Sequence, residues 1–241
     1  MSKNSVMREL FKKLYTASAE SFYSVLNSDL QLGNKRFIVT ANPEAFVLAC
    51  ENEDIRELIL SDNTTVVADG IGIVKTASHF KCKVTERIPG VEISKKLFEA
   101  ANEMNKSLYL FGAKMEVVEA LSSVIKADYP NIKLLGFSDG YAEDKDAVFE
   151  QIKDLSPDIV LVALGMPHQE RLIFRHLKDF SKGIFVGVGG SFDVLSGKKI
   201  RAPKIFIKLN LEWLYRITRE PKRIKRFIKG NIKFLFMVFK S

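Results

Sequence analysis

One stretch of the sequence joins a strand, a glycine turn and a basic segment: Gly187-Val188-Gly189-Gly190-Ser191-Phe192-Asp193-Val194-Leu195-Ser196-Gly197-Lys198-Lys199-Ile200-Arg201-Ala202-Pro203. The apolar run 183–188 predicts a buried strand. Gly189 and Gly190 lack a Cβ, so their backbone N–H groups can approach an anion closely. A tight turn without a ligand is the alternative if these glycines are taken alone.

Outward from this stretch, apolar runs alternate with helical patterns. Strands are predicted at 37–39, 65–68, 108–111, 132–137, 159–164 and 183–188, and helices at 43–60, from 69 to 80, 114–129, 143–155 and 167–179. This order predicts an α/β fold, a mainly parallel Rossmann-like sheet flanked by helices. We expect an N-terminal helical segment at 1–34, an α/β catalytic domain at 35–202 and a basic amphipathic tail at 203–241.

Polar clusters stand where four of these strands should end. They are Thr40-Ala41-Asn42-Pro43-Glu44, Asp69-Gly70-Ile71-Gly72, Gly165-Met166-Pro167-His168-Gln169-Glu170 and Gly189-Gly190. Ligands of parallel sheets bind beyond the carboxyl ends of the strands, so the clusters predict one shared site. Each cluster alone is also typical of helix caps and turns. Asp69 fits a general base at the sheet edge or, equally, a cap for the helix that follows.

The positive charge of the chain belongs to its tail. Fourteen of the 37 Lys and Arg residues follow Gly197 with only Glu212 and Glu220, which gives this segment +12 and the remainder −4. Apolar residues recur at helical spacing on one face of the tail: Ile224, Phe227, Ile228, Ile232, Leu235, Phe236 and Phe239. A basic amphipathic helix of this kind is typical of attachment to anionic lipid. A helix packed on the core, with a solvated charged face, is the alternative.

Several classes of protein find no support. Two cysteines and three histidines form no zinc-like pattern, which indicates a reducing compartment without a structural metal. There is no secretory signal, no membrane-spanning run, no nucleic-acid-binding motif and no nucleophile elbow. The phosphate-loop and dinucleotide patterns are incomplete. Asp144-Lys145-Asp146 resembles a metal-binding triplet of glycosyltransferases, but its place at a helix start favours a solvated cap.

Taken together, the motifs resemble those of the WecG/TagA/CpsF family of bacterial glycosyltransferases. They are Thr40-x-Asn42-Pro43-Glu44, Asp69-Gly70-x-Gly72, Arg87-x-x-Gly90, Gly165-x-Pro167-x-Gln169-Glu170, Gly187-Val188-Gly189-Gly190-x-Phe192-Asp193, Arg201-Ala202-Pro203, Leu211-Glu212-Trp213-x-x-Arg216 and Glu220-Pro221-x-Arg223-x-x-Arg226. The resemblance runs from about Lys35 to Lys229. The first ~30 residues lack the short strand that usually opens the family's fold.

The resemblance implies an inverting, metal-independent enzyme with no cofactor. It would move an N-acetylhexosamine, most commonly N-acetylmannosamine, from a UDP donor to a polyprenyl-diphosphate-linked sugar in teichoic acid, common antigen or capsule synthesis. Asp69 would be the catalytic base. Residues expected to bind substrate are Thr40, Asn42, Arg87, Gln169, Gly189, Gly190, Asp193, Arg216, Arg223 and Arg226. Guanidinium groups suit this role, because they offset the charge that grows on the leaving diphosphate.

We therefore expect a peripheral protein on the cytoplasmic face of the membrane. Its partners would be the UDP-sugar, the lipid-linked acceptor and an anionic membrane surface, with homo-oligomers possible and no nucleic acid bound. Two other functions stay open at this point. One is a non-catalytic adaptor that binds nucleotide-sugar or lipid, and the other is a nucleic-acid-binding protein supported by charge alone.

Overall fold

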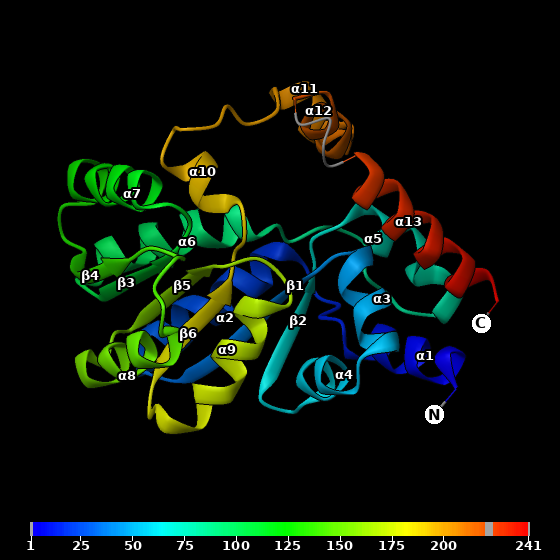
Figure 1. Ribbon diagram of the computed structural model, residues 1–241, viewed down its shortest axis with the longest axis horizontal. Helices are drawn as coiled ribbons and strands as arrows, with labels where there is room; N and C mark the ends of the chain where they lie inside the picture. Colours follow the sequence, from blue (N-terminus) through cyan, green and yellow to red (C-terminus); the bar gives the residue numbers. More distant parts are fainter. Residues whose placement is uncertain (1, 220–223, 241) are drawn as a thin grey trace.

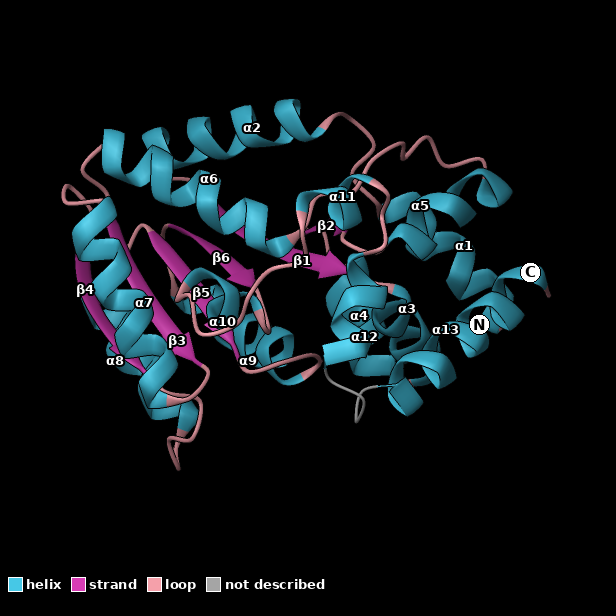
Figure 2. Ribbon diagram, turned by 90° about the horizontal axis from the view of Figure 1, so that it is seen from above, coloured by secondary structure: helices cyan, strands magenta, loops and turns pink. Residues whose placement is uncertain are grey.

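The computed structural model describes residues 2–219 and 224–240, and its centre is one parallel sheet. The strands lie in the order β2, β1, β6, β5, β3, β4 (Figure 2). Their bounds are β1 (Lys35–Ala41), β2 (Thr64–Ala68), β3 (Ser107–Gly112), β4 (Lys133–Ser138), β5 (Ile159–Ala163) and β6 (Gly183–Gly187). Every strand pairing is parallel, so all six carboxyl ends meet at one edge, as the sequence predicts.

Helices cover both faces of the sheet (Figure 1). They are α1 (Lys3–Lys13), α2 (Ala19–Leu32), α3 (Pro43–Glu51), α4 (Glu53–Leu60), α5 (Ile71–Ala77), α6 (Gly90–Glu103), α7 (Met115–Asp128), α8 (Lys145–Leu155), α9 (His168–His176), α10 (Ser191–Leu195), α11 (Lys204–Lys208), α12 (Glu212–Arg219) and α13 (Ile224–Phe239), with short 3-10 turns η1 (Ser78–Phe80) and η2 (Leu177–Asp179). The Rossmann-like α/β class is therefore confirmed.

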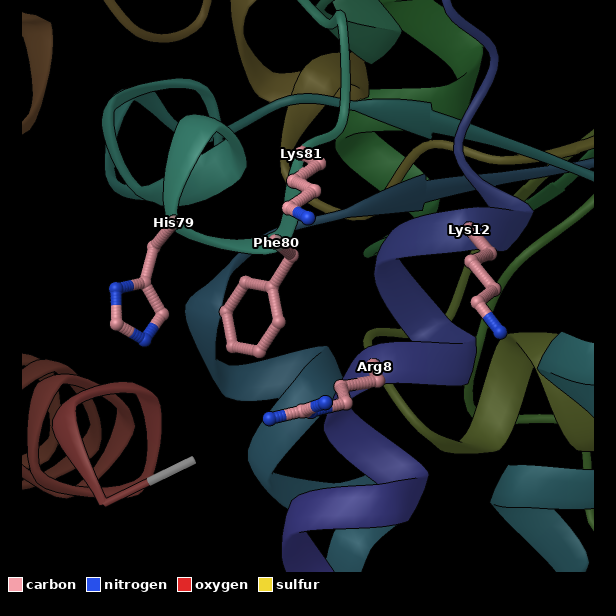
Figure 3. Close-up of a pocket in the computed structure, with 5 residues that line it drawn as sticks. All are labelled: Arg8, Lys12, His79, Phe80 and Lys81. Atoms are coloured by element: carbon pink, nitrogen blue, oxygen red, sulfur yellow. The ribbon is translucent and has the colours of Figure 1, made fainter.

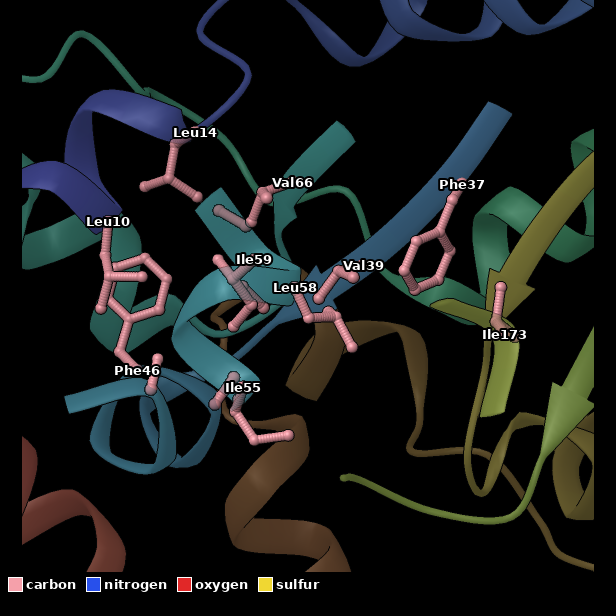
Figure 4. Packing of buried hydrophobic residues seen from close by; sticks show 14 of the residues in the cluster. Leu10, Leu14, Phe37, Val39, Phe46, Ile55, Leu58, Ile59, Val66 and Ile173 are labelled. Atoms are coloured by element: carbon pink, nitrogen blue, oxygen red, sulfur yellow. The ribbon is translucent and has the colours of Figure 1, made fainter. Parts of the chain in front are cut away.

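Two hydrophobic cores lie on the two faces of the sheet. Successive residues of a strand point to opposite faces, so Phe37 and Val39 enter one core and Ile38 enters the other. The first core packs strands against α1, α3, α4 and α9 (Figure 4) and also against α8. The second core packs them against α2, α6 and α7. Burial on both faces explains why β3, β5 and β6 are almost continuously apolar, whereas the edge strand β4 is only partly buried.

The N-terminal segment is part of these cores. Helix α1 contributes Phe11 to the first core, and α2 contributes Phe22 to the second. Between them, Leu14 forms one isolated parallel bridge with Val66 of β2. Helices α1 and α2 make up most of this segment, and they complete both faces of the sheet.

Two helices differ from the prediction. The predicted helix 43–60 is divided at Asn52, whose extended backbone (φ −120°, ψ 124°) ends α3 and begins α4. Helix α6 was not predicted at all, although Ser94, Leu97, Phe98 and Ala101 are buried at helical spacing. Polar and small residues among them weaken this apolar pattern, which explains why it was missed.

The last helix of the tail has two apolar sides. Its inner side packs Phe234, Met237 and Val238 into the first core against α1 and α3. Its outer side exposes apolar side chains to solvent: Ile228, Ile232, Leu235, Phe236 and Phe239. The chain ends lie side by side (Figures 1 and 2), and the Asn4 amide donates to the Lys240 carbonyl at 2.6 Å. Within the described residues, no helix is long and apolar enough to cross a bilayer.

Candidate active site

The ends of strands β1 and β6 meet at Thr40, at the carboxyl edge of the sheet. Its buried hydroxyl donates to the carbonyl oxygen of Gly187 at 3.1 Å. A Cβ on Gly90, the first residue of α6, would lie 3.5 Å from Thr40 Cγ2 and 3.7 Å from Ser191 Oγ. Three chain segments thus converge on this threonine.

Asp69 lies beside this point, directly after β2. Its backbone N–H donates to the Ala41 carbonyl at 2.9 Å, and its side chain is half-buried. A Cβ on Gly70 would lie 2.8 Å from Pro43 Cδ and 3.5 Å from Asn42 Cα, so the two loops are in close contact. Glycine at position 70 therefore holds Asp69 next to the loop of Asn42.

Asn42 acts as the N-cap of α3. Its Oδ1 accepts from the Ala45 N–H at 3.0 Å, which orients the amide at the sheet edge. Because Oδ1 serves the cap, the amide NH2 is the part of Asn42 that suits contact with a ligand. The N-cap position of α5 is Gly70, one residue after Asp69.

The side chain of Gln169 holds the glycine turn after β6 in place. Its buried Oε1 accepts from the N–H groups of Gly165 at 3.0 Å and Gly189 at 3.1 Å. Its Nε2 donates to Glu170 Oε1 at 2.7 Å. Gly189 has φ +48°, a conformation that favours glycine. In this arrangement Gln169 positions the turn, and Gly190 is the exposed residue of that turn.

Glu170 is a buried acid. The sequence places it in the motif that ends with Gln169-Glu170 but does not show its burial. Its side chain is 1% exposed, and this desolvation raises its pKa to about 7, against the opposing hydrogen bond from Gln169. Within the described part of the chain, its Oε2 has no hydrogen-bond partner. A Cβ on Gly187 would lie 2.8 Å from Oε1, so the carboxyl group packs directly under the end of β6.

A cavity of about 350 Å³ opens beside the glycine turn, between α10, the segment 198–202 and α12. Its lining is Gly190, Asp193, Val194, Lys198, Lys199, Ile200, Arg201, Ala202, Glu212, Tyr215 and Arg219. Arg201 forms an ion pair with Glu92, and Lys199 Nζ lies 3.5 Å from Asp193 Oδ1. Of this lining, only Gly190 and Asp193 were predicted as site residues. The lining holds four cations and two carboxylates, Asp193 and Glu212, and its excess positive charge makes the cavity suitable for an anion.

Arg87 connects the sheet edge to the tail. The neighbouring Ile88 N–H donates to the Ala68 carbonyl at 2.7 Å and so fixes the loop to the end of β2. The Arg87 guanidinium lies 3.9 Å from the carboxylate of Glu212, the first residue of α12. Both side chains are mostly buried. The tail therefore returns to the carboxyl edge of the sheet at α12.

The three tail arginines of the prediction are only partly placed. The backbone of Arg216 belongs to α12 and that of Arg226 to α13, but their side chains lie outside what the structure describes. Arg223 lies outside the described residues altogether. Arg219, which was not predicted, stands on α12 at the cavity, with its guanidinium 5.6 Å from the ring centre of Tyr215.

One group of possible metal ligands occurs among the described residues: Glu150, His176 and Asp179. None of the three lines the cavity beside Gly190. His176 Nε2 lies 2.7 Å from the Asp146 carboxylate, so Asp146 is part of an ion-pair network. Asp144 accepts from the Ala147 N–H at 2.9 Å and caps α8, as the sequence predicts for the Asp144-Lys145-Asp146 triplet.

Comparison with known proteins gives consistent matches. The family model described as glycosyl transferase WecG/TagA/CpsF family matches residues 10–241, beginning already within α1. The chain is 44% identical over 193 residues, covering 79% of this chain and 74% of the relative, to an N-acetylglucosaminyldiphosphoundecaprenol N-acetyl-beta-D-mannosaminyltransferase of Bacillus subtilis strain 168. Relatives with the same name are 38% identical in Bacillus spizizenii (86% of this chain, 81% of the relative) and 39% identical in Staphylococcus aureus strain MW2 (88% and 82%).

Proposed function

The chain belongs to the WecG/TagA/CpsF family of glycosyltransferases, and from this membership we propose which sugar it transfers and how. The donor is UDP-N-acetylmannosamine, and the acceptor is N-acetylglucosamine carried on a polyprenyl diphosphate. The observation that carries this proposal is the 38–44% identity to relatives named for that transfer, over most of both chains.

Asp69 is the base in the proposed reaction. Its carboxylate takes the proton from an acceptor hydroxyl, whose oxygen attacks the anomeric carbon of the donor as the bond to UDP breaks. Attack from the face opposite the leaving group inverts that carbon. The half-buried position of Asp69 beside the Asn42 loop supports this role, because the contact of Gly70 with Pro43 fixes the two loops together.

Cationic side chains stabilise the departing UDP in this proposal, in place of a metal ion. Arg87 and Arg201 stand at the sheet edge and at the cavity, each beside a glutamate. Arg216, Arg223 and Arg226 of the tail would complete the set, and the return of α12 to Arg87 supports their approach. Guanidinium groups form paired hydrogen bonds with diphosphate oxygens and so favour the charge that develops there.

The remaining predicted residues have assigned places in the same reaction. Thr40 and Asn42 line the sugar-binding region in this proposal, with Gly90 and Ser191 next to Thr40. The Gly189-Gly190 turn offers backbone N–H groups to an anion, and Gln169 holds that turn in shape. Asp193 lines the cavity and orients Lys199.

The proposed location is the inner face of the cell membrane. The outer side of α13 exposes apolar residues, and Ile205 and Leu209 of the tail are also exposed. Exposed lysines, among them Lys204, Lys208 and Lys229, accompany them. Apolar and basic side chains together favour an anionic lipid surface. Without a membrane, the same surface would favour self-association.

Release of UDP in the presence of a soluble diphosphate-linked N-acetylglucosamine analogue tests the proposal. A panel of UDP-sugars should give turnover with UDP-N-acetylmannosamine well above that with UDP-glucose or UDP-N-acetylglucosamine. Turnover with another UDP-sugar alone would reject the assigned donor. Vesicle binding without turnover of any donor would favour the non-catalytic adaptor.

A further inference from the structure

A second cavity, of about 450 Å³, lies between α1 and the η1 turn. It is lined by Arg8, Lys12, His79, Phe80 and Lys81 (Figure 3). Four of these five side chains are cationic or can become so, and the five lining residues include no carboxylate. The Lys12 ammonium is paired with Glu9 at 2.8 Å, so Arg8, His79 and Lys81 are the groups that suit an anion. The composition is that of a pocket for a phosphate group.

The walls of this basic pocket are fixed by the core. Phe80 stacks on Phe11 with ring centres 4.3 Å apart and an interplanar angle of 13°. Arg8 and Lys12 stand four residues apart on α1 and therefore share one face of the helix. Lys81 follows η1 in the left-handed conformation, with φ +55°. The cations are thus held by a packed helix and a stacked turn.

The basic pocket adjoins the outer side of α13. The ring of His79 lies 6.2 Å from that of Phe239, centre to centre, and Phe239 is 73% exposed. The Lys240 ammonium lies 4.1 Å from the ring centre of Phe236, which is also exposed. A phosphate in the pocket would therefore lie next to a surface of exposed phenylalanines.

We propose that the basic pocket binds the phosphate of an anionic phospholipid headgroup while the outer side of α13 enters the lipid layer. The inference rests on the membrane location in the proposed function. A lipid satisfies both features at once, because its phosphate pairs with Arg8 and Lys81 and its acyl chains cover Phe236 and Phe239. A free phosphate would leave the phenylalanines exposed.

Sedimentation with lipid vesicles tests the pocket. The double variant Arg8→Gln/Lys81→Gln removes two of its cations. The control Lys126→Gln/Lys133→Gln removes two exposed cations from α7 and β4, at the other end of the molecule (Figure 1). On mixed phosphatidylglycerol and phosphatidylcholine vesicles, the pocket variant should need roughly tenfold or more lipid for half-maximal binding. The control should bind as the wild type does.

Equal losses in both double variants, or no loss in the pocket variant, would overturn the headgroup pocket. On vesicles of phosphatidylcholine alone, the wild type and the pocket variant should bind equally weakly. If the unfolding temperature of the double variant falls, Lys81→Gln alone replaces it, with an expected loss of roughly fivefold. Turnover of the soluble acceptor analogue should not change in the pocket variant. Absence of turnover in the wild type would count against the proposed function and leave the vesicle comparison valid.

Discussion

The Arg87 guanidinium lies 3.9 Å from the Glu212 carboxylate, and this pair joins the sheet edge to the first residue of α12. The Arg87 side chain is 14% exposed and that of Glu212 is 7% exposed. Because a buried carboxylate is costly without a cation, the pair favours the position in which α12 lies over the site.

Replacing Arg87 with alanine should loosen the tail. We expect a loss of about 2 kcal/mol from docking of α12, between the values typical of exposed and buried ion pairs. Trypsin should then cleave faster at Lys204 and Lys208 in the absence of substrate. Lys96→Ala, which removes an exposed pair with Glu99, is the matched control and should leave cleavage unchanged. Cleavage of Arg87→Ala at the wild-type rate would show that the Arg87–Glu212 pair does not hold α12 in place.

Asp69→Asn should lower kcat by roughly two to four orders of magnitude, because the amide cannot accept the acceptor's proton. Binding of UDP should stay within a few-fold of the wild type, since the side chains have nearly the same shape. Rates of UDP release and a UDP titration measure the two effects. Asp62→Asn, on an exposed turn before β2, serves as the control. Equal turnover of Asp69→Asn and wild type would remove Asp69 as the base.

Gly70→Ala should reduce turnover by moving the Asp69 loop. The added Cβ would lie 2.8 Å from Pro43 Cδ, so one of the two loops must shift. The control is Gly230→Ala within α13, where no atom lies within 4 Å of the added Cβ. Alanine there should stabilise the helix by about 0.5–1 kcal/mol. Thermal unfolding and UDP release together distinguish the two sites, and normal turnover in Gly70→Ala would show that the loop contact is not needed.

Glu170→Gln should change how stability depends on pH. Burial raises the pKa of Glu170 from 4.5 to about 7 in the folded protein, so folding favours the protonated form. The stability contributed by that form is complete below pH 4.5 and is lost as the pH rises through 7. Relative to wild type, the glutamine variant should therefore gain about 3 kcal/mol between pH 4.5 and 8.

Urea unfolding at several pH values measures this difference. Glu57→Gln on the exposed side of α4 is the control and should show no such gain. If the unfolding free energies of the wild type and of Glu170→Gln change with pH in parallel, the Glu170 carboxyl group is not held neutral. The glutamine keeps an acceptor for the Gln169 amide, so turnover at pH 6 should be nearly normal.

Truncation before Pro203 should destabilise the sheet domain as well as abolish turnover. It removes Phe234, Met237 and Val238 from the first core and uncovers Phe46. Phe234→Ala alone should cost about 3–4 kcal/mol, the range for a large aromatic in a packed core. Ile232→Ala on the exposed outer side should leave the unfolding temperature unchanged. A fully stable truncated domain would contradict the packing of α13.

The sheet was predictable from the sequence because most of its strands are buried on both faces and read as apolar runs, although the edge strand β4 is only partly buried. The positions of Thr40, Asp69 and Gly189 at the sheet edge were predictable for a related reason, since each follows directly on an apolar run. Their roles in the reaction stay a proposal. The burial of Glu170 was not predictable, because nothing in the sequence distinguishes a buried acid in a helix from a solvated one. Its environment comes from the end of β6, which packs on it from elsewhere in the chain.

Contacts between distant segments explain the other differences. The basic pocket combines Arg8 of α1 with Lys81, more than seventy residues later, and no local pattern marks that pairing. For α13, the periodicity predicted the apolar outer side correctly, but Phe234, Met237 and Val238 form a second side that it did not separate. A helix with two apolar sides has no single polar face from which its orientation can be predicted.

The two sides of α13 obey different rules of substitution. Side chains on the inner side must fit against Phe11 and Phe46, whereas those on the outer side need only be apolar. Substitutions confined to the outer side should therefore change the proposed affinity for a bilayer without disturbing the packing of the first core. The sheet and the candidate active site at its edge should stay unchanged by such substitutions.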